Sequence, residues 1–213
     1  MDKTRHIVIE GPIGVGKTSL TLMLAERFGA RPVLEKVDEN PFLADFYRDP
    51  RKYAFQVQLF FLLTRYQQHK ELAQPDLFER STVCDYIFAK DRIFAYLNLD
   101  ENEIMLYERI YSMLEPAAIK PDLVVFLVAS PKMLFKRIRL RNRPYERKIT
   151  AEYLEELVSA YNKFFFSYNQ SPLLVVNTSE LDFVHSKEDF ERLVEEIVSH
   201  NRGVKHFIPI GSG

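Results

Sequence analysis

The residues best suited to chemistry lie near the amino terminus, where a short apolar run leads into a glycine-rich loop. The run is Ile7-Val8-Ile9, and residues 11–18 follow with the sequence G-P-I-G-V-G-K-T. Glycines let a backbone turn tightly enough for several N–H groups to point inward, and the helix that follows adds its positive dipole end. Such a loop binds polyphosphate. Lys17 would contact the terminal phosphates, and the Thr18 hydroxyl would bind Mg²⁺.

The residues on both sides of this loop predict the order strand, loop, helix. After the loop, apolar residues recur at helical spacing up to Phe28, and Gly29 then predicts the end of the helix. A ligand-free glycine turn is the alternative, but such a turn does not require Lys-Thr at its end. The predicted phosphate site comprises Gly11, Gly14, Val15, Gly16, Lys17, Thr18 and Ser19.

A long helix of mixed character is predicted further along the chain. Asp49-Pro50 predicts its first turn, and the pattern continues to about Leu72. Gln58, Phe61 and Arg65 fall at i, i+3 and i+7, so one face carries an amide, an aromatic ring and a guanidinium. Polar groups on a largely apolar helix indicate contact with a ligand. The alternative is that Gln58 and Arg65 emerge at the solvent edge of the helix.

Polar side chains also lie at the ends of predicted strands. Glu35 ends the second predicted strand, the pair Glu79-Arg80 lies near the end of a third one at 76–81, and Asn177 follows the fifth. The carboxyl ends of parallel strands meet at one edge of a sheet, where the ligands of α/β proteins bind. We therefore expect these side chains and Lys17 to face one crevice.

The densest run of cations lies in the segment at about 137–149. Arg137 and Arg141 fall at i and i+4 on one helix face, and Arg143 follows at the end of that helix. Three guanidiniums aimed the same way repel one another unless an anion lies between them. A charge run is usually a solvated face, and we keep that interpretation for the other two arginines of the run. The segment is predicted to form an arginine-bearing lid over a phosphoryl group.

The order of the predicted elements indicates the fold class. Strands alternate with helices, and the predicted strands lie at 6–10, 32–35, 76–81, 122–128 and 173–176. Alternating elements form a parallel sheet that helices cover on both faces, which is an α/β architecture. A length of 213 residues is sufficient for one sizeable core and short for two, so one domain spanning 1–213 is expected.

Charge and composition argue against several classes of protein. The net charge of −1 disfavours a protein that binds nucleic acid or a membrane surface through bulk positive charge. Cys84 is the only cysteine, which excludes an internal disulfide, and no stretch approaches the ~18 apolar residues of a membrane span. The first predicted strand begins too close to Met1 for a secretory signal, so we expect a cytoplasmic protein.

Together these residues suit phosphoryl transfer, which needs positioning, charge neutralisation and a base for the acceptor hydroxyl. Glu35 could accept the proton, and Arg80 could hold both that carboxylate and the transferred group. Lys17 and the lid arginines could neutralise charge on the donor phosphates. The alternative for Glu35 is a plain ion pair at the edge of a helix.

Four segments, taken together, are specific to one protein family. They are G-P-I-G-V-G-K-T at 11–18, F-Q-V-Q-L-F-F-L-L-T-R at 55–65, E-R-S-T-V-C-D-Y-I-F at 79–88 and R-I-R-L-R-N-R-P-Y-E at 137–146. Over almost its whole length the chain resembles the deoxyribonucleoside kinases, in particular the bacterial deoxyadenosine and deoxyguanosine kinases. The resemblance implies a P-loop kinase fold with a five-stranded parallel sheet, a mobile lid and a homodimer. It also implies transfer of the γ-phosphate of ATP, with Mg²⁺, to the 5′-hydroxyl of a 2′-deoxynucleoside.

The resemblance implies catalytic roles for single residues. Glu35 matches the general base of the family, and Arg80 matches the catalytic arginine beside it. Glu79 matches the acid that helps Thr18 to hold Mg²⁺. The lid arginines of the family are matched by Arg137, Arg141 and Arg143.

The resemblance also implies how the nucleoside is bound. Gln58 matches the amide that contacts the base, with Arg65 and Asp85 as its partners at the base edge. Tyr47 and Glu146 match the pair that binds the 3′-hydroxyl of the sugar. These residues would make the protein selective for the sugar as well as for the base.

Donors and acceptors at this base edge predict a preference. Gln58 and Asp85 can accept from an exocyclic amine, and Arg65 can donate to a ring nitrogen or a carbonyl. Thymine lacks the amine, so we expect deoxyadenosine or deoxyguanosine as the substrate, deoxycytidine next and thymidine last. Phe61, a bulky residue between Gln58 and Arg65, departs from the animal members of the family and leaves this ranking open.

Two other functions stay open at this point. A thymidylate-type nucleoside monophosphate kinase shares the loop and the lid, but it would need extra cations near Tyr47 and Gln58. A catalytically silent kinase-fold subunit would not need Lys17, Glu35 and Arg80 in one cleft. A switch GTPase is excluded because its guanine-binding N-K-x-D sequence is missing.

Overall fold

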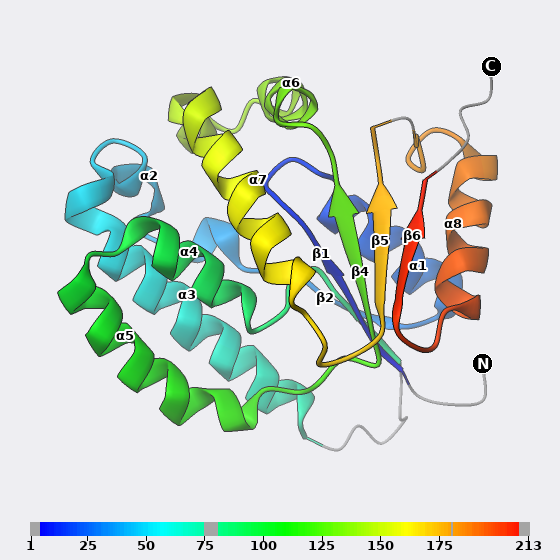
Figure 1. Cartoon of the computed structure of the whole chain (residues 1–213), viewed down its shortest axis with the longest axis horizontal. Coiled ribbons are helices and arrows are strands. Elements are labelled where there is room, and N and C mark those ends of the chain that lie inside the picture. The colour runs from blue at the N-terminus through cyan, green and yellow to red at the C-terminus, as the bar shows by residue number, and fades with distance from the viewer. Residues whose placement is uncertain (1–4, 75–80, 180, 209–213) are drawn as a thin grey trace.

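The computed structural model describes residues 5–74, 81–179 and 181–208. Helices and strands alternate along most of this part of the chain (Figure 1). The strands are β1 (His6–Glu10), β2 (Arg31–Val33), β3 (Thr82–Cys84), β4 (Leu123–Val128), β5 (Leu173–Asn177) and β6 (Val204–Phe207). The α-helices are α1 (Lys17–Phe28), α2 (Leu43–Phe46), α3 (Pro50–Leu72), α4 (Lys90–Asn98), α5 (Glu101–Leu114), α6 (Pro131–Arg141), α7 (Ala151–Phe166) and α8 (Lys187–Ser199). Short 3-10 helices are η1 (Val37–Glu39), η2 (Glu115–Ala117) and η3 (Pro144–Lys148).

The strands form one parallel sheet in the order β2-β3-β1-β4-β5-β6. β1 lies inside the sheet, and its Ile7 is in register with Val83 of β3 and Leu123 of β4. Every residue of β1 is buried, as expected for a parallel strand between two layers of helices. The glycine-rich loop leaves the carboxyl end of β1 and therefore lies at the edge where β2 and β3 also end.

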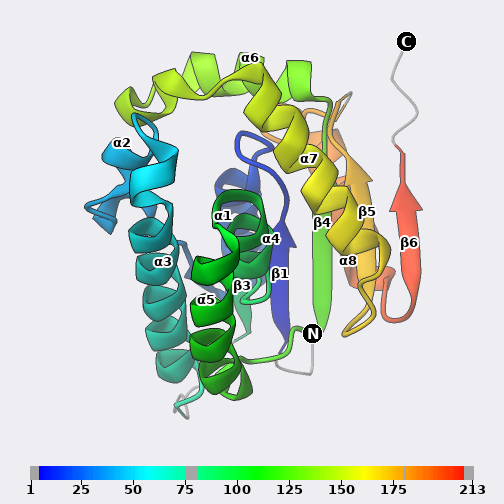
Figure 2. The same cartoon turned by 60° about the vertical axis from the view of Figure 1, so that its left-hand side comes forward.

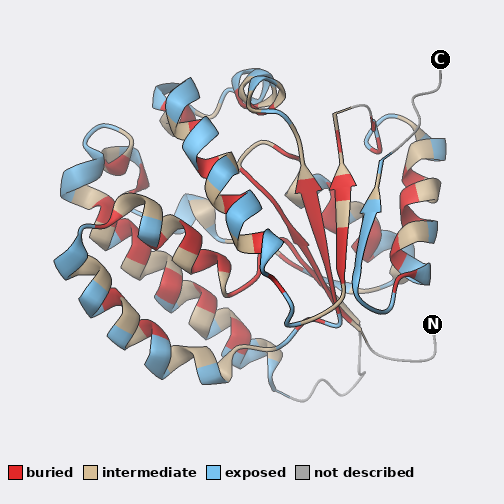
Figure 3. Cartoon of the chain, viewed as in Figure 1, coloured by how far each residue is buried: buried red, intermediate tan, exposed pale blue. Residues whose placement is uncertain are grey.

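Alternate residues of the strands point to opposite faces of the sheet, and each face has its own helices. Ile7 and Ile9 pack with α1 and α8 in one core, whereas Val8 packs with α4 and α7 in another. The buried residues accordingly follow the strands and the inner sides of the helices (Figure 3). The predicted α/β class, with a parallel sheet covered on both faces, is confirmed.

A further layer of helices lies beyond α4. α3 and α5 run side by side there, with α2 at one end of α3 (Figure 2). Leu62 of α3 and Tyr107 and Tyr111 of α5 are fully buried in a third core. This packing turns Gln58 and Arg65 of α3 inward, so the alternative that they emerge at the solvent edge is wrong. Within the described residues no helix is both long and apolar enough to cross a bilayer.

The sheet has six strands, and the prediction of five is therefore wrong. The additional strand, β6, pairs in parallel with β5 at the edge of the sheet. Its residues Val204, Lys205 and His206 are exposed, and only Phe207 is half-buried. A strand that buries so little has no apolar run by which the sequence would indicate it.

The third strand also differs from its prediction. The strand expected at 76–81 falls mainly on residues 75–80, which lie outside the described residues, and β3 follows it at Thr82–Cys84. The residue at the carboxyl end of β3 is therefore Asp85, because Glu79 and Arg80 come before this strand in the chain. The second strand is close to its prediction, but it ends at Val33, so Glu35 lies just beyond it.

Candidate active site

The glycine-rich loop connects β1 to α1 at the carboxyl edge of the sheet. Gly16 has a φ of 109° immediately before α1 begins at Lys17, a conformation that residues with side chains rarely adopt. At Gly14 a Cβ atom would lie 2.8 Å from Ile138 Cγ1, so α6 approaches the loop closely because this residue is glycine. Lys17 Nζ donates a hydrogen bond to the carbonyl oxygen of Gly11 at 2.7 Å. The ammonium is therefore held against the loop that is predicted to bind phosphates.

A buried carboxylate fixes the position of this loop through hydrogen bonds. Glu10 Oε1 accepts hydrogen bonds from the backbone N–H of Gly11 at 2.8 Å and from the Tyr161 hydroxyl at 3.2 Å. Glu10 Oε2 accepts a bond from the backbone N–H of Ile87 at 2.9 Å. Because Ile87 belongs to the turn between β3 and α4, Glu10 fixes the loop relative to that turn.

Asp85 lies between the phosphate loop and the end of β2. Its Oδ2 accepts a hydrogen bond from Thr18 Oγ1 at 2.8 Å, and its Oδ1 accepts one from the backbone N–H of Glu35 at 2.6 Å. The two oxygens of one carboxylate thus contact the first turn of α1 and the residue predicted to be the base. Asp85 was expected beside Gln58 and Arg65, and the structure places it beside Thr18 instead.

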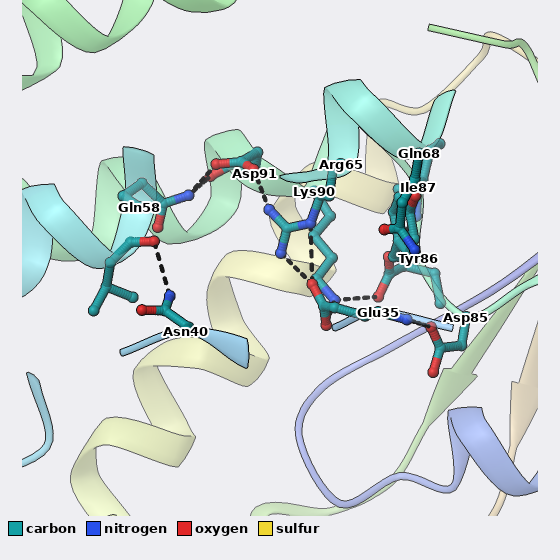
Figure 4. A network of polar contacts seen from close by, with 12 residues as sticks. Glu35, Asn40, Gln58, Arg65, Gln68, Asp85, Tyr86, Ile87, Lys90 and Asp91 are labelled. Atoms are coloured by element: carbon teal, nitrogen blue, oxygen red, sulfur yellow. Dashed lines mark hydrogen bonds and ion pairs between the residues drawn. The ribbon is translucent and has the colours of Figure 1, made fainter. Parts of the chain in front are cut away.

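Glu35 is held by two buried cations. Lys90 Nζ donates to Glu35 Oε2 at 2.9 Å, and Arg65 donates to Glu35 Oε1 from Nε at 3.0 Å and also from Nη2 (Figure 4). Burial alone would raise the pKa of Glu35, but the charges of Lys90 and Arg65 outweigh burial and hold the pKa well below its usual range. Glu35 is therefore a carboxylate at neutral pH.

Asp91 accepts hydrogen bonds from the polar side chains of α3. Gln58 Nε2 donates to the backbone oxygen of Asp91 at 2.9 Å and also to its carboxylate, and Arg65 Nη1 donates to the second carboxylate oxygen. The Tyr107 hydroxyl donates to the same carboxylate at 3.2 Å. The amide nitrogen of Gln58 is thus fully used, and its carbonyl oxygen is directed away from Asp91 (Figure 4).

The arginine-bearing segment lies across the top of the site in α6 and η3 (Figure 2). Arg141 Nε donates to Glu146 Oε2 at 3.1 Å, and Arg143 Nη1 donates to the Tyr145 hydroxyl at 2.7 Å. The Tyr145 hydroxyl in turn donates to Asp38 Oδ1 at 2.7 Å. Since Asp38 belongs to η1, this contact joins the segment to the residues that follow Glu35.

Arg137 is directed away from the other two lid arginines. Its Nη1 donates to the backbone oxygen of Val15 at 3.2 Å and to Thr178 Oγ1 at 3.1 Å, and its Nη2 donates to the backbone oxygen of Thr178 at 2.8 Å. Among the described residues, Arg141 and Arg143 line the cavity that Lys17 and Glu35 also line, and Arg137 does not. Arg137 therefore joins α6 to the phosphate loop and to the residues after β5.

One cavity brings most of the predicted site residues together. Its lining includes Gly14, Lys17, Thr18, Glu35, Tyr47, Gln58, Phe61, Arg65, Asp85, Arg141, Arg143 and Glu146. The other predicted loop residues, Gly11, Val15, Gly16 and Ser19, lie in the same loop or in the first turn of α1. Glu79 and Arg80 lie outside the described residues, so the roles predicted for them stay predictions.

Lys90 and Asp91 were not predicted, although they lie at the centre of the site. They stand side by side between Phe88 and Ile93, both of which are buried. Opposite charges inside an apolar segment indicate buried ion pairs, because an unpaired buried charge is costly. This signal was present in the sequence, but nothing in the sequence shows that the pair faces Glu35 and Gln58.

The fold and the site together define a class of protein. A glycine-rich loop after the first strand presents a lysine to a cavity, a carboxylate faces that cavity from the end of the second strand, and arginines overhang it. Positioned cations and a base around a phosphate loop suit phosphoryl transfer to a hydroxyl group. This arrangement is that of a P-loop kinase.

Comparisons with known proteins narrow this class. The model of the deoxynucleoside kinase family matches residues 7–201. The chain is 36% identical over 202 residues to a deoxyguanosine kinase of Bacillus subtilis, which covers 92% of this chain and 98% of that protein. It is 36% identical over 179 residues to a deoxyadenosine kinase of Dictyostelium discoideum, with 82% of this chain and 73% of that protein covered.

A solved structure gives the same result. A deoxyadenosine kinase from M. mycoides with bound dATP matches the fold with a TM-score of 0.80 at 27% identity. The match covers 92% of this chain and 100% of the M. mycoides chain. The protein belongs to the deoxynucleoside kinase family.

Proposed function

We propose that this protein transfers the γ-phosphate of ATP to the 5′-hydroxyl of a purine 2′-deoxynucleoside. The position of Glu35 carries the proposal, because its ionised carboxylate lines the same cavity as Lys17 of the phosphate loop. A base on one side of a cavity and a phosphate-binding lysine on the other are what transfer to a hydroxyl requires. The match to the family and the likeness to a kinase with bound dATP support the proposal.

In the proposed reaction Glu35 accepts the proton of the 5′-hydroxyl as the hydroxyl oxygen bonds to the γ-phosphorus, and the bond from that phosphorus to the β–γ bridging oxygen breaks and releases ADP. Burial and the nearby Lys90 charge lower the pKa of Lys17 to about 8, so most Lys17 side chains keep their charge at neutral pH and stabilise the donor phosphates. Arg141 and Arg143 reach the cavity from the lid and stabilise charge on the transferred group. A lid over the site also excludes water, which would otherwise compete as acceptor.

Thr18 and Asp85 offer the oxygen ligands that Mg²⁺ prefers. The hydroxyl oxygen of Thr18 and a carboxylate oxygen of Asp85 are 2.8 Å apart at the start of α1, beside the phosphate loop. These two groups would hold the Mg²⁺ that accompanies ATP. When bound, the ion neutralises charge on the phosphates. The acid predicted for this purpose, Glu79, lies outside the described residues.

The nucleoside is proposed to lie between Glu35 and α3. Tyr47 and Glu146 line the cavity on the lid side, where they would bind the 3′-hydroxyl of the sugar. Because Asp91 uses both donors of the Gln58 amide, Gln58 presents an acceptor to the base. An acceptor at this position favours a base with an exocyclic amine and disfavours thymine. The related deoxyguanosine and deoxyadenosine kinases support a purine.

A panel of acceptors tests this function. With ATP and Mg²⁺, we expect kcat/KM for deoxyadenosine or deoxyguanosine to exceed that for thymidine by about tenfold or more, because the site holds an acceptor that thymine cannot use fully. Deoxycytidine should rank between them. Thymidine monophosphate is the control acceptor and should not be phosphorylated. Fastest turnover of thymidine would contradict the base assignment, and turnover of the monophosphate alone would indicate a nucleoside monophosphate kinase.

The protein is also proposed to form a homodimer through α3 and α5. Leu106 and Met113 of α5 are 48% and 79% exposed, and Leu63 of the neighbouring α3 is 47% exposed. Exposed apolar side chains on adjacent helices favour burial against another chain. A second copy of the same face is the partner that the family resemblance implies.

Introducing charged residues on this face of α3 and α5 tests the dimer. We expect Leu106→Glu with Met113→Glu to lower the mass in solution to that of one chain, 25.1 kDa, in light scattering after gel filtration. The reason is that two copies of the new carboxylates would have to be buried in the interface. Phe166→Glu is the matched control, since Phe166 is 95% exposed on α7, away from this face. Equal masses for wild type and the double variant would contradict an α3–α5 interface.

A further inference from the structure

Lys90 is a buried cation that the proposed mechanism has not used. It is the first residue of α4 and is 2% exposed, yet it lies on the wall of the cavity. Its ammonium is 2.9 Å from Glu35 Oε2 and 4.0 Å from Glu10 Oε1. Burying a lysine is costly unless partners offset the lost hydration. The two carboxylates that flank Lys90 provide this compensation.

The charges around Lys90 show which carboxylate depends on it. Arg65 is divided between two acids, because it donates to Glu35 and to Asp91. Glu10 has three other donors, which are two backbone N–H groups and a tyrosine hydroxyl. For Glu35 Oε2, however, Lys90 is the donor that the described residues supply. The loss of Lys90 would therefore affect Glu35 most.

We propose that Lys90 is a positioning residue that fixes the direction of the Glu35 carboxylate toward the acceptor hydroxyl. With Arg65 on Oε1 and Lys90 on Oε2, the carboxylate is held at both oxygens (Figure 4). Oε1 accepts both Arg65 donors, whereas Oε2 accepts Lys90 and keeps a second lone pair, which can accept the hydroxyl proton. The inference rests on the proposed function, because it concerns the base of that reaction. The sequence predicts Arg80 for this task, and the described structure supplies Lys90.

Other charged groups also act on Glu35 and Lys90. Without Lys90, Glu35 Oε2 would lose its donor, and the carboxylate would be held by Arg65 through Oε1 alone. The remaining titratable and charged groups that face this pair are Glu10 of β1, Lys17 of α1, Arg65 of α3, Asp85 and Tyr86 after β3, Asp91 of α4 and Tyr161 of α7.

The separate effects on kcat and KM distinguish positioning from mere structural support. We expect Lys90→Met to lower kcat for deoxyadenosine or deoxyguanosine by about tenfold or more, with the nucleoside KM within about threefold of wild type. The reason is that the Glu35 carboxylate loses the donor on Oε2 and is no longer held toward the hydroxyl, whereas the proposed contacts to base and sugar come from other residues.

Two further variants complete the experiment. Lys90→Arg keeps a charged donor and should restore most of kcat, whereas Lys163→Met removes an exposed lysine of α7 and should match wild type. A wild-type kcat in Lys90→Met, or a kcat in Lys90→Arg as low as in Lys90→Met, would overturn the proposal. If Lys90→Met does not fold, as judged by circular dichroism and thermal melting, Lys90→Gln is the second neutral variant. Loss of folding in both would also overturn the proposal.

The two hypotheses fail in different ways. If the wild-type chain phosphorylates no deoxynucleoside with ATP at any pH, the proposed function is wrong. If the wild type is active and Lys90→Met keeps the wild-type kcat, the function stands and the role of Lys90 is wrong. An active wild type, a lowered kcat in Lys90→Met and its recovery in Lys90→Arg support both.

Discussion

Replacing Glu35 with glutamine should lower kcat by about 10²-fold or more while the dissociation constant of the nucleoside changes little. Glutamine has nearly the same shape, and its carbonyl oxygen can still accept hydrogen bonds from Arg65, but its amide cannot accept the proton of the 5′-hydroxyl. Binding should survive because the proposed contacts to base and sugar come from other residues. Single-turnover rates together with calorimetric titration of the nucleoside measure the two quantities separately.

A neighbouring acid provides the control for this experiment. Glu39 lies in η1, four residues after Glu35, and its side chain is 59% exposed. Glu39→Gln removes a carboxylate from the same segment and should leave kcat near the wild-type value. A wild-type kcat in Glu35→Gln would assign the base to another group.

The second large effect is expected at Asp85. Asp85→Asn should lower kcat by about 10²-fold or more on every nucleoside and raise the Mg²⁺ concentration needed for half-maximal rate. The reason is that Asp85 lies 2.8 Å from Thr18 Oγ1, where its charge would hold the ion. Neutralising charge on the phosphates is worth several kcal/mol, and each 1.4 kcal/mol is about tenfold in rate. Initial rates over a range of Mg²⁺ concentrations at fixed ATP measure both effects.

Asp91→Asn is the matched change behind the base-binding wall of the cavity, which Gln58 and Arg65 line. Asp91 contacts Gln58 and Arg65, so this variant should alter the ranking of bases more than it alters the rate with the best one. The pair of variants thereby separates the two carboxylates that the sequence alone does not distinguish. If Asp85→Asn changes the ranking of bases and leaves the Mg²⁺ requirement unchanged, Asp85 contacts the base, as the sequence predicts.

The phosphate loop could be predicted because its function is encoded in adjacent residues. Eight consecutive positions carry the glycines, Lys17 and Thr18, and the structure places α1 where the helical pattern begins. The long helix was predicted for a similar reason, because a proline marks its start and α3 runs from Pro50 to Leu72 as expected. Local patterns determine elements of this kind.

Other features depend on contacts between distant residues, which the sequence does not show. The choice between Asp85 and Asp91 depends on where β3 ends and how the chain then turns into α4. β3 has only three residues, so a prediction that places it six residues too early also misplaces the acids after it. Lys90 meets Glu35 across 55 positions of sequence, and no local pattern specifies such a pair.

The edge strand and Arg137 show two further limits. β6 is stabilised by its pairing with β5 rather than by burial of its own side chains, so hydrophobic pattern gives no indication of it. Arg137 and Arg141 share one helix face, as their i, i+4 spacing predicts, but Arg137 donates its hydrogen bonds to oxygens of Val15 and Thr178. Spacing predicts which residues share a face and leaves open which partner each one finds.

The carboxylate of Asp85 has a consequence for how the two substrates influence one another. It touches Thr18, at the nucleotide end, and the backbone of Glu35, at the nucleoside end. A ligand that shifts the Asp85 carboxylate at one end changes the geometry of the binding site at the other end, so the two binding equilibria are thermodynamically coupled. If the nucleotide changes the affinity for the nucleoside by some factor, the nucleoside changes the affinity for the nucleotide by the same factor, whichever of them binds first.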